Sequence, residues 1–135
     1  IVRKMLNDRL TQNGKLLRIA HRGYIPENSM LGFKNAIARG CDMIECDVRL
    51  SVDKYPVIIH DKTVNRTTKE TGYVHCLHKY ELENYGVPSL ELMLEWLTTI
   101  DASIYVAFEL KDLGTVSANT LLLDNTLHLL QNEFG

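Results

Sequence analysis

Reactive side chains recur at the ends of four apolar segments of the sequence. They are His21 with Arg22, Glu45 with Asp47, His60, and Glu109 with Lys111. Three carboxylates crowded together repel one another unless their pKa values rise, cations pair with them or they share a metal. An all-oxygen ligand set suits a hard ion, Mg²⁺ or Ca²⁺, better than it suits zinc.

Imidazole and cationic groups accompany these carboxylates. His21 and His60 are suited to proton transfer beside a metal, because imidazole titrates near neutral pH. Arg22 and Lys111 carry the positive charge that a phosphate requires. The set therefore predicts a metal-assisted phosphoester site.

Each of these groups has an ordinary explanation when it is taken alone. A single histidine is more often structural, two carboxylates on a strand are more often solvated, and His60-Asp61 is compatible with a turn. Glu109 and Lys111 alone would suggest a surface ion pair that contributes little stability. The functional interpretation depends on all of them falling at strand ends together.

The periodicity of apolar residues predicts the elements that carry these groups. The expected strands cover residues 16–20, 43–50, 56–60 and 104–110, and the expected helices cover 2–10, 29–39, a segment opened by Pro88-Ser89, and a segment after Gly114. In the last helix, Leu123, Leu127, Leu130 and Phe134 share one face. The alternation of strands and helices indicates an α/β fold, in which the carboxyl ends of parallel strands form the active-site face.

The alternation of side chains along a strand determines which residues lie together. Glu45 and Asp47 point to one face of their strand, and Glu109 and Lys111 share a face in the same way. Ile44, Cys46 and Val48 point to the opposite face, where helices can cover them. The strands over 43–50 and 56–60 are too close in sequence for the crossover that a parallel pair needs.

Length and composition are those of one globular domain covering residues 1–135. The chain is 45% hydrophobic and 24% charged with a net charge of −2, so no broad basic face suggests a nucleic-acid partner. No apolar run approaches the roughly 20 residues of a transmembrane span, and no signal-peptide pattern opens the chain. Three cysteines, an odd number, weakly favour a reducing compartment, so we expect a cytoplasmic protein.

A series of short motifs resembles the glycerophosphodiester phosphodiesterase family. The matching segments are residues 19–23, 26–29, 33–36, 40–48, 57–61, 66–68, 87–90 and 108–111. They occur in the family's order and cover the chain from about residue 16 to residue 113. The resemblance implies a TIM barrel with a small insertion after an early strand, which would correspond to residues 61–86, and it places the strands over 43–50 and 56–60 side by side.

The resemblance also implies a role for each reactive residue. The metal ligands would be Glu45, Asp47 and Glu109, and the catalytic pair would be His21 and His60. Arg22 and Lys111 would contact the substrate phosphate. Glu27 is expected near the metal without binding it, and Asn28 is expected to cap the helix that follows.

The implied reaction hydrolyses a glycerophosphodiester, or a lysophospholipid, to glycerol 3-phosphate and an alcohol. One histidine takes the proton of the neighbouring glycerol hydroxyl, the other protonates the leaving alkoxide, and water opens the cyclic phosphate. The motifs do not say which histidine acts first, nor do they choose between Mg²⁺ and Ca²⁺. Two alternatives remain: a catalytically weak or inactive module that binds glycerophosphate-containing lipids or polymers, and a lyase acting on choline-containing sphingolipids.

The chain supplies about four of the eight strands of a TIM barrel, a fold that usually takes about 250 residues. The sequence is therefore compatible with a fragment, with a half-barrel completed by a second copy, or with a shortened domain that binds without turnover. Because unpaired strand edges invite association, we expect a homo-oligomer if the chain is complete.

Overall fold

The computed structural model of the chain describes residues 16–100 and 103–133. Its elements are β1 (Ile19–His21), α2 (Met30–Ala38), β2 (Met43–Leu50), β3 (Pro56–Ile58), a 3₁₀ turn (Val74–Cys76), α3 (Lys79–Asn84), α4 (Leu90–Thr99), β4 (Tyr105–Leu110), α5 (Val116–His128) and a π-helical turn (Leu129–Glu133). These elements confirm the predicted α/β class. The helix predicted over residues 2–10 lies outside the described residues.

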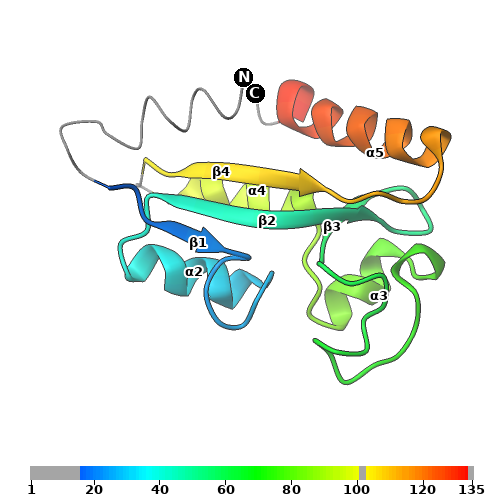
Figure 1. The fold of residues 1–135 in the computed structure, drawn as a ribbon, viewed down its shortest axis with the longest axis horizontal. Helices are drawn as coiled ribbons and strands as arrows, with labels where there is room; N and C mark the ends of the chain where they lie inside the picture. The colour runs from blue at the N-terminus through cyan, green and yellow to red at the C-terminus, as the bar shows by residue number, and fades with distance from the viewer. Residues whose placement is uncertain (1–15, 101–102, 134–135) are drawn as a thin grey trace.

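Strand β2 is the centre of a four-stranded sheet (Figure 1). It pairs in parallel with β1 through residues 43–45, and in parallel with β4 through residues 43–48. Because both pairings involve the first half of β2, β1 and β4 lie on opposite edges of it. All three strands therefore deliver their carboxyl ends to the same rim.

Strand β3 differs from its neighbours because it runs antiparallel to β2. Val48 pairs with Ile58 and Leu50 pairs with Pro56, and a tight turn at residues 51–55 joins the two strands. A link of this length closes a hairpin but cannot make a parallel crossover. The hairpin carries the chain beyond the rim and back again, so that the Ile59 amide donates to the Asp47 carbonyl and His60 returns to the level of the acidic residues.

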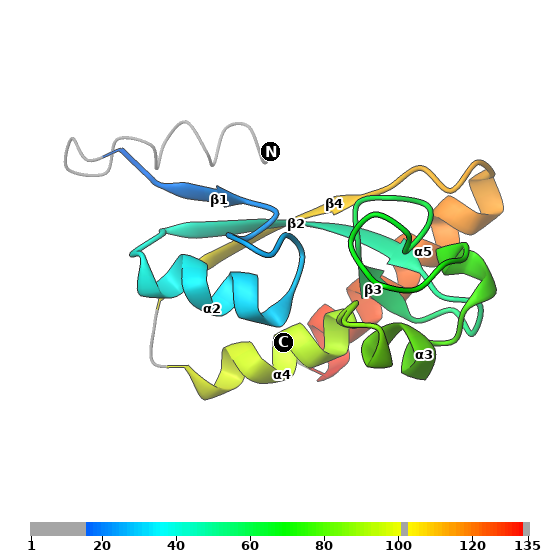
Figure 2. The ribbon, with the colours of Figure 1, turned by 90° about the horizontal axis from the view of Figure 1, so that it is seen from below.

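The two faces of the sheet have opposite character. Ile44, Cys46 and Val48 are fully buried. Ile44 and Cys46 pack in one cluster with residues of the helices, including Phe33 of α2 and Met93 of α4. Figure 2 shows α2 and α4 on the same face of the sheet. The alternation of β2 therefore directs its acidic side chains to the other face, as predicted.

Residues 61–86 form a small insertion with a hydrophobic core of its own. Val64, Val74 and Leu82 are buried together with Val57 and Val87, which flank the segment in sequence. Periodic signals are few in this segment and α3 was not predicted, because the apolar residues of this core are widely spaced. The insertion lies beside the hairpin, at the carboxyl end of the sheet (Figure 1).

The last helix buries a different face from the one predicted to pack. Leu122 and Thr126 of α5 are buried with Leu129 of the following turn, whereas Leu123 and Leu127 are 44% and 39% exposed. The predicted leucines do lie on one face of the helix, but it is the adjacent face, with Leu122, that contacts the sheet. Phe134 lies outside the described residues. None of the described helices combines the length and the apolar character that crossing a bilayer requires.

Candidate active site

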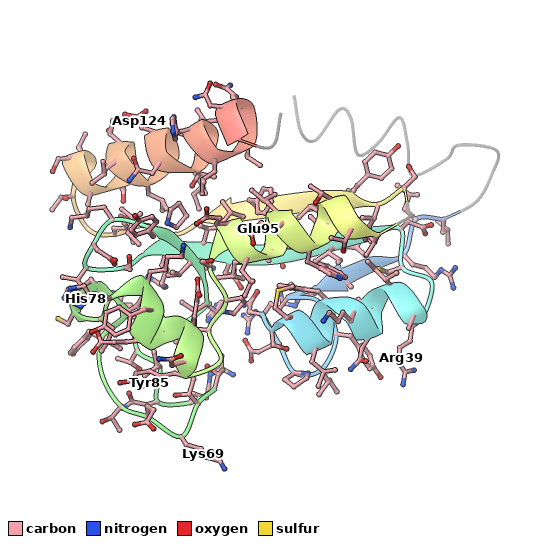
Figure 3. The ribbon with its side chains drawn as sticks, turned by 180° about the vertical axis from the view of Figure 1, so that it is seen from behind. Arg39, Lys69, His78, Tyr85, Glu95 and Asp124 are labelled. Atoms are coloured by element: carbon pink, nitrogen blue, oxygen red, sulfur yellow. The ribbon has the colours of Figure 1, made fainter. Side chains whose placement is uncertain are left out.

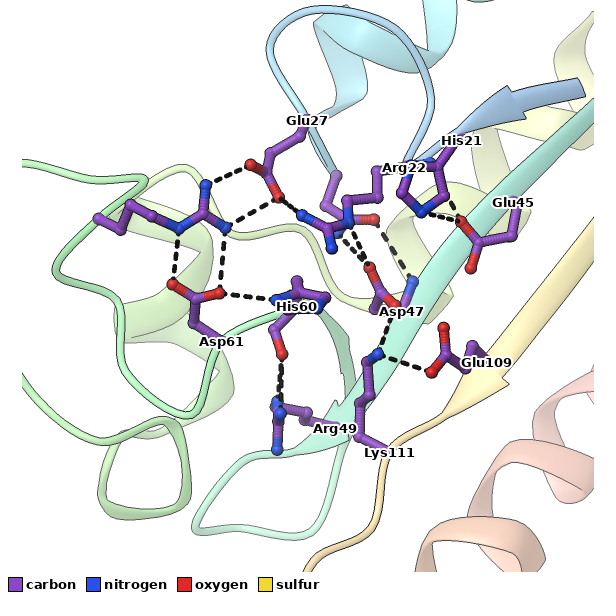
Figure 4. A network of polar contacts seen from close by, with 12 residues as sticks. His21, Arg22, Glu27, Glu45, Asp47, Arg49, His60, Asp61, Glu109 and Lys111 are labelled. Carbon is purple, nitrogen blue, oxygen red and sulfur yellow. Dashed lines mark hydrogen bonds and ion pairs between the residues drawn. The ribbon is translucent and has the colours of Figure 1, made fainter.

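Strand register brings the predicted carboxylates together. His21 of β1 lies opposite Glu45 of β2, and Asp47 of β2 lies opposite Glu109 of β4. Each of Glu45, Asp47 and Glu109 has a carboxylate oxygen within 4.8 Å of those of the other two. Figure 4 shows this acidic cluster together with the two histidines that were predicted from the sequence.

Asp47 is the most enclosed member of the cluster, with a side chain only 1% exposed. Burial alone would raise its pKa, but the hydrogen bond from Asn28 and the ammonium group of Lys111 hold the pKa below its usual range. Lys111 Nζ lies 3.0 Å from Asp47 Oδ1 and 2.7 Å from Glu109 Oε1. The carboxylates therefore already gather around a positive charge.

The acidic cluster fits a hard divalent cation. Its donors are all carboxylate oxygens, the type that Mg²⁺ and Ca²⁺ prefer. Asp47 Oδ1 is buried, and among the described residues it has an ion pair with Lys111 but no hydrogen bond. Because this buried carboxylate oxygen accepts no hydrogen bond from any residue that the structure describes, it is a suitable ligand for a cation.

A tight turn after β1 positions Arg22. Both Arg22 and Gly23 have positive φ angles, 57° and 75°. Gly23 is required, because a Cβ at this position would lie 2.7 Å from the Phe33 ring. The turn lets the Arg22 amide donate to Glu45 Oε2 at 3.1 Å and places Arg22 Nε 3.6 Å from Asp47 Oδ2.

Asn28 was expected to cap helix α2, and that prediction is wrong. Ser29 is the N-cap, since its hydroxyl accepts from the Gly32 amide. Asn28 is instead buried with a φ of 48°, and its amide group donates to Asp47 Oδ2 at 2.9 Å. Asn28 is thus a site residue that the sequence analysis missed, although it lies in one of the motifs behind the resemblance.

The two histidines reach the acidic cluster from different elements. His21 is 73% exposed, and its Nε2 lies 3.8 Å from Glu45 Oε2. His60 follows β3, its carbonyl accepts two hydrogen bonds from the Arg49 guanidinium, and its Nδ1 lies 2.7 Å from Asp61 Oδ1. An ionised Asp61 can only accept, so this contact places the imidazole proton on Nδ1 and leaves Nε2 unprotonated in the neutral ring.

Arg66 and Glu27 extend the site to one side. Arg66 donates to both oxygens of Asp61, at 2.8 and 3.0 Å, and it also donates to Glu27. Glu27 accepts in turn from Arg22 Nη1 at 3.2 Å. Hydrogen bonding to Arg66 is the main reason that the pKa of Asp61 and the pKa of Glu27 both lie below their usual values. Glu27 therefore contacts the partners of the acidic cluster rather than the cluster itself.

A cavity of about 820 Å³ adjoins Glu109 and Lys111. It lies between the hairpin, the insertion and the start of α5, and its lining includes Arg49, Lys62 and Tyr73. The cavity gives a substrate-sized molecule access to one side of the acidic cluster.

Comparison with known sequences identifies relatives over most of the chain. A sequence model described as the glycerophosphoryl diester phosphodiesterase family matches residues 20–132. A glycerophosphodiester phosphodiesterase of Bacillus altitudinis is 38% identical over 109 residues, which is 69% of this chain and 44% of that protein. One from Caldanaerobacter subterraneus is 51% identical over 63 residues, covering 44% of this chain and 26% of that protein.

Solved structures with the same fold bear equivalent names. A phosphodiesterase of Oleispira antarctica, in complex with the product sn-glycerol-3-phosphate, matches with a TM-score of 0.76 and 26% identity, covering 88% of this chain and 53% of that chain. A glycerophosphodiester phosphodiesterase of Agrobacterium tumefaciens matches with a TM-score of 0.63 and 32% identity, covering 82% and 54%. The chain spans about half the length of these proteins, which confirms the prediction of a partial TIM barrel. The family match over residues 20–132 and this shared fold establish that the chain belongs to the glycerophosphoryl diester phosphodiesterase family.

Proposed function

We propose that this chain carries the catalytic residues for metal-dependent hydrolysis of glycerophosphodiesters to glycerol 3-phosphate and an alcohol. The observation that carries the proposal is the convergence of Glu45, Asp47 and Glu109 within 4.8 Å, beside two histidines from other elements. The names of the relatives and the product complex of the Oleispira protein support it. The chain spans about half the length of the Oleispira protein, so we put forward the activity of this chain as a proposal.

The two histidines have environments suited to opposite roles. His60 holds its Nδ1 proton against Asp61, so its Nε2 is the atom that would accept the proton of the attacking glycerol hydroxyl. His21 lies 3.8 Å from Glu45, a carboxylate that can balance the charge of an imidazolium. We therefore assign His60 as the base and His21 as the acid that protonates the leaving alkoxide.

The cations of the site complement an anionic substrate. Lys111 and Arg22 both lie next to Asp47, where they would approach the phosphate oxygens. A Mg²⁺ or Ca²⁺ ion held by Glu45, Asp47 and Glu109 would neutralise phosphate charge and lower the pKa of the attacking hydroxyl. The cavity beside Glu109 and Lys111 would receive the leaving alcohol.

An assay of glycerol 3-phosphate release tests this function. The purified chain is incubated with glycerophosphocholine, glycerophosphoglycerol or a lysophospholipid in the presence of Mg²⁺ or Ca²⁺, and then with a chelator. We expect release that the chelator abolishes and that His60→Ala or His21→Ala lowers by about 10²–10⁴-fold. Release that persists in both histidine variants would contradict the assignment.

A binding module for glycerophosphate-containing lipids or polymers is the second candidate. It would account for Arg22 and Lys111, whose cationic groups beside Asp47 suit a bound phosphate whether or not a diester is hydrolysed. This function predicts that glycerol 3-phosphate raises the melting temperature of the chain while no diester is hydrolysed. His60→Ala would then leave the thermal shift largely intact, whereas Asp47→Asn would abolish it.

The remaining predictions concern association and location. A homo-oligomer that completes the sheet would pair strand edges that have no partner among residues 16–100 and 103–133, and light scattering of the purified chain measures its mass directly. The expected cytoplasmic location also remains a prediction, which imaging of a tagged protein in its own cells would test.

A further inference from the structure

Arg66 is the one residue of the insertion that joins the two loops flanking the acidic cluster. Its planar guanidinium donates four hydrogen bonds, two to Asp61 and two to Glu27. Asp61 directly follows His60 beyond the end of β3, and Glu27 belongs to the loop that begins with Arg22. Arginine is suited to this position because its fixed fork of donors can hold two carboxylates at once.

Hydrophobic packing does not perform the same task. The buried residues of the insertion, including Val64, Val74 and Leu82, form a cluster distinct from the one that contains Phe33 of α2. Within residues 16–100 and 103–133, the hydrogen bonds between the insertion and the loop after β1 are those from Arg66 to Glu27. Among the described residues, this charged contact is therefore the direct hydrogen-bonded link between the two loops.

Each carboxylate that Arg66 contacts also accepts a hydrogen bond from a residue of the candidate active site. On one side, Asp61 accepts from His60 Nδ1 at 2.7 Å. On the other, Glu27 accepts from Arg22, whose Nε lies 3.6 Å from the buried Asp47. Cationic and acidic side chains therefore alternate from His60 through Asp61, Arg66 and Glu27 to Arg22 and Asp47. Figure 4 shows this network of contacts.

We propose that Arg66 is a positioning residue that fixes the orientation and tautomer of His60 by holding Asp61 and Glu27 together. The inference rests on the proposed function, since it assigns His60 to the reaction. Without Arg66, Asp61 loses the cation that fixes its carboxylate plane, and the Nδ1 proton of His60 loses its fixed acceptor. Arg66 then acts on the reaction through Asp61, without touching the substrate.

A surface ion pair with no role in the site is the competing explanation. Arg66 is half exposed, which fits a small contribution to stability, but the side chains of Asp61 and Glu27 are only 25% and 27% exposed. The two explanations differ in what they predict for the rate. A structural ion pair changes stability and leaves kcat alone, whereas a positioning residue changes kcat and leaves stability nearly unchanged.

The test compares Arg66→Met with a matched control, Lys69→Met. Lys69 is an exposed cation at the tip of the same insertion (Figure 3). We expect Arg66→Met to lower kcat by about 10–100-fold with little change in KM. Its melting temperature should change by no more than about 4 °C. Arg66→Lys, which keeps the charge but loses the fork, should recover only part of kcat, and Lys69→Met should behave as the parent chain.

A second readout does not depend on turnover. The ¹⁵N chemical shifts of the His60 ring report which nitrogen carries the proton, and we expect the Nδ1-protonated form in the parent chain and a mixture in Arg66→Met. An unchanged tautomer together with an unchanged kcat would overturn the inference, as would full recovery of both kcat and melting temperature by Arg66→Lys. If the parent chain releases no glycerol 3-phosphate, the proposed activity fails, and the tautomer measurement alone decides the role of Arg66.

Discussion

The acidic cluster and the insertion beside it are held in place by different forces. Asp47 and Glu109 are register partners on β2 and β4, and Glu45 lies two residues before Asp47 on β2, so the strands fix the spacing of the three carboxylates. His60 and Asp61 lie beyond the end of β3, where side-chain hydrogen bonds and ion pairs fix theirs. The candidate site therefore combines two kinds of support. The carboxylates are positioned by the pairing of strands, whereas the positions of His60 and Asp61 depend on individual side-chain contacts that a single substitution can remove.

The largest effect is expected in the part that register fixes. Asp47→Asn keeps the shape of a buried side chain but removes the charge that Lys111 and Arg22 face. It should weaken Mg²⁺ or Ca²⁺ binding and lower glycerol 3-phosphate release by more than about 100-fold, because loss of an outer-shell partner alone typically costs 10–100-fold. Titration calorimetry with each ion and initial-rate measurements check both effects.

Asp124→Asn is the matched control for that substitution. Asp124 is an exposed carboxylate on α5 (Figure 3), and it is not a member of the acidic cluster. The same loss of one negative charge at this position should leave ion binding and rate unchanged. Equal losses in the two variants would mean that net charge, rather than the acidic cluster, governs ion binding.

An intermediate effect is expected where a loop supports a strand residue. Asn28→Gly removes the amide that donates to Asp47 but keeps a backbone suited to a φ of 48°. Leaving the buried carboxylate oxygen without this donor should cost about 1–3 kcal/mol of unfolding free energy, and activity should fall by about 10–100-fold. Urea denaturation and initial rates measure these changes.

Asn28→Ala separates the hydrogen bond from backbone strain. It removes the same amide and also forces a side chain into a left-handed conformation, so it should be less stable than Asn28→Gly. The two variants should lose similar activity. A glycine variant as active as the parent chain would show that strand register alone orients Asp47.

The smallest effect concerns pH and the charged contacts of the insertion. The pKa values of Asp61 and Glu27 are lowered in the folded protein from ordinary values of 3.8 and 4.5, first of all by hydrogen bonds to Arg66. Groups with lowered pKa values stabilise the fold above their unfolded pKa, and this contribution is lost as pH falls through the folded pKa. The difference in melting temperature between the parent chain and Arg66→Met should therefore be largest near neutral pH and shrink below about pH 4.5.

Thermal denaturation of both proteins from pH 7 to pH 3 measures this trend. Lys69→Met, which lacks these contacts, should follow the parent chain throughout. A difference between parent and Arg66→Met that stays constant as pH falls would mean that Arg66 stabilises the fold through its aliphatic stem rather than through the two carboxylates.

The features of the site that were predicted from the sequence are those that depend on the alternation of side chains along a strand. The shared face of Glu45 and Asp47, and the burial of Ile44, Cys46 and Val48, follow from alternation along β2. The apolar pattern also placed His60 at the end of a strand, but it did not give the direction of that strand, which is antiparallel to β2. The local pattern therefore predicted which face of a strand is buried, but not whether the neighbouring strand runs parallel or antiparallel to it.

The contacts missed from sequence are those made between distant segments by exposed or turn residues. Arg66 and Glu27 are 39 positions apart, and no local pattern connects them. Asn28 precedes a helix, a position where asparagine is common as a cap, and only the structure shows that its side chain turns to Asp47 instead. Which of the two neighbouring leucine-containing faces of α5 is buried likewise depends on which one contacts the sheet.

The hairpin formed by β2 and β3 has a consequence for the order in which the site assembles. Asp47 and His60 are thirteen residues apart in sequence, whereas Asp47 and Glu109 are separated by sixty-two. Closing the shorter loop costs less chain entropy, so we expect the hairpin to form early and the parallel pairing of β2 with β4 to follow. A nascent chain would then hold His60, the proposed proton acceptor, beside Asp47 before Glu109 arrives to complete the proposed cation site.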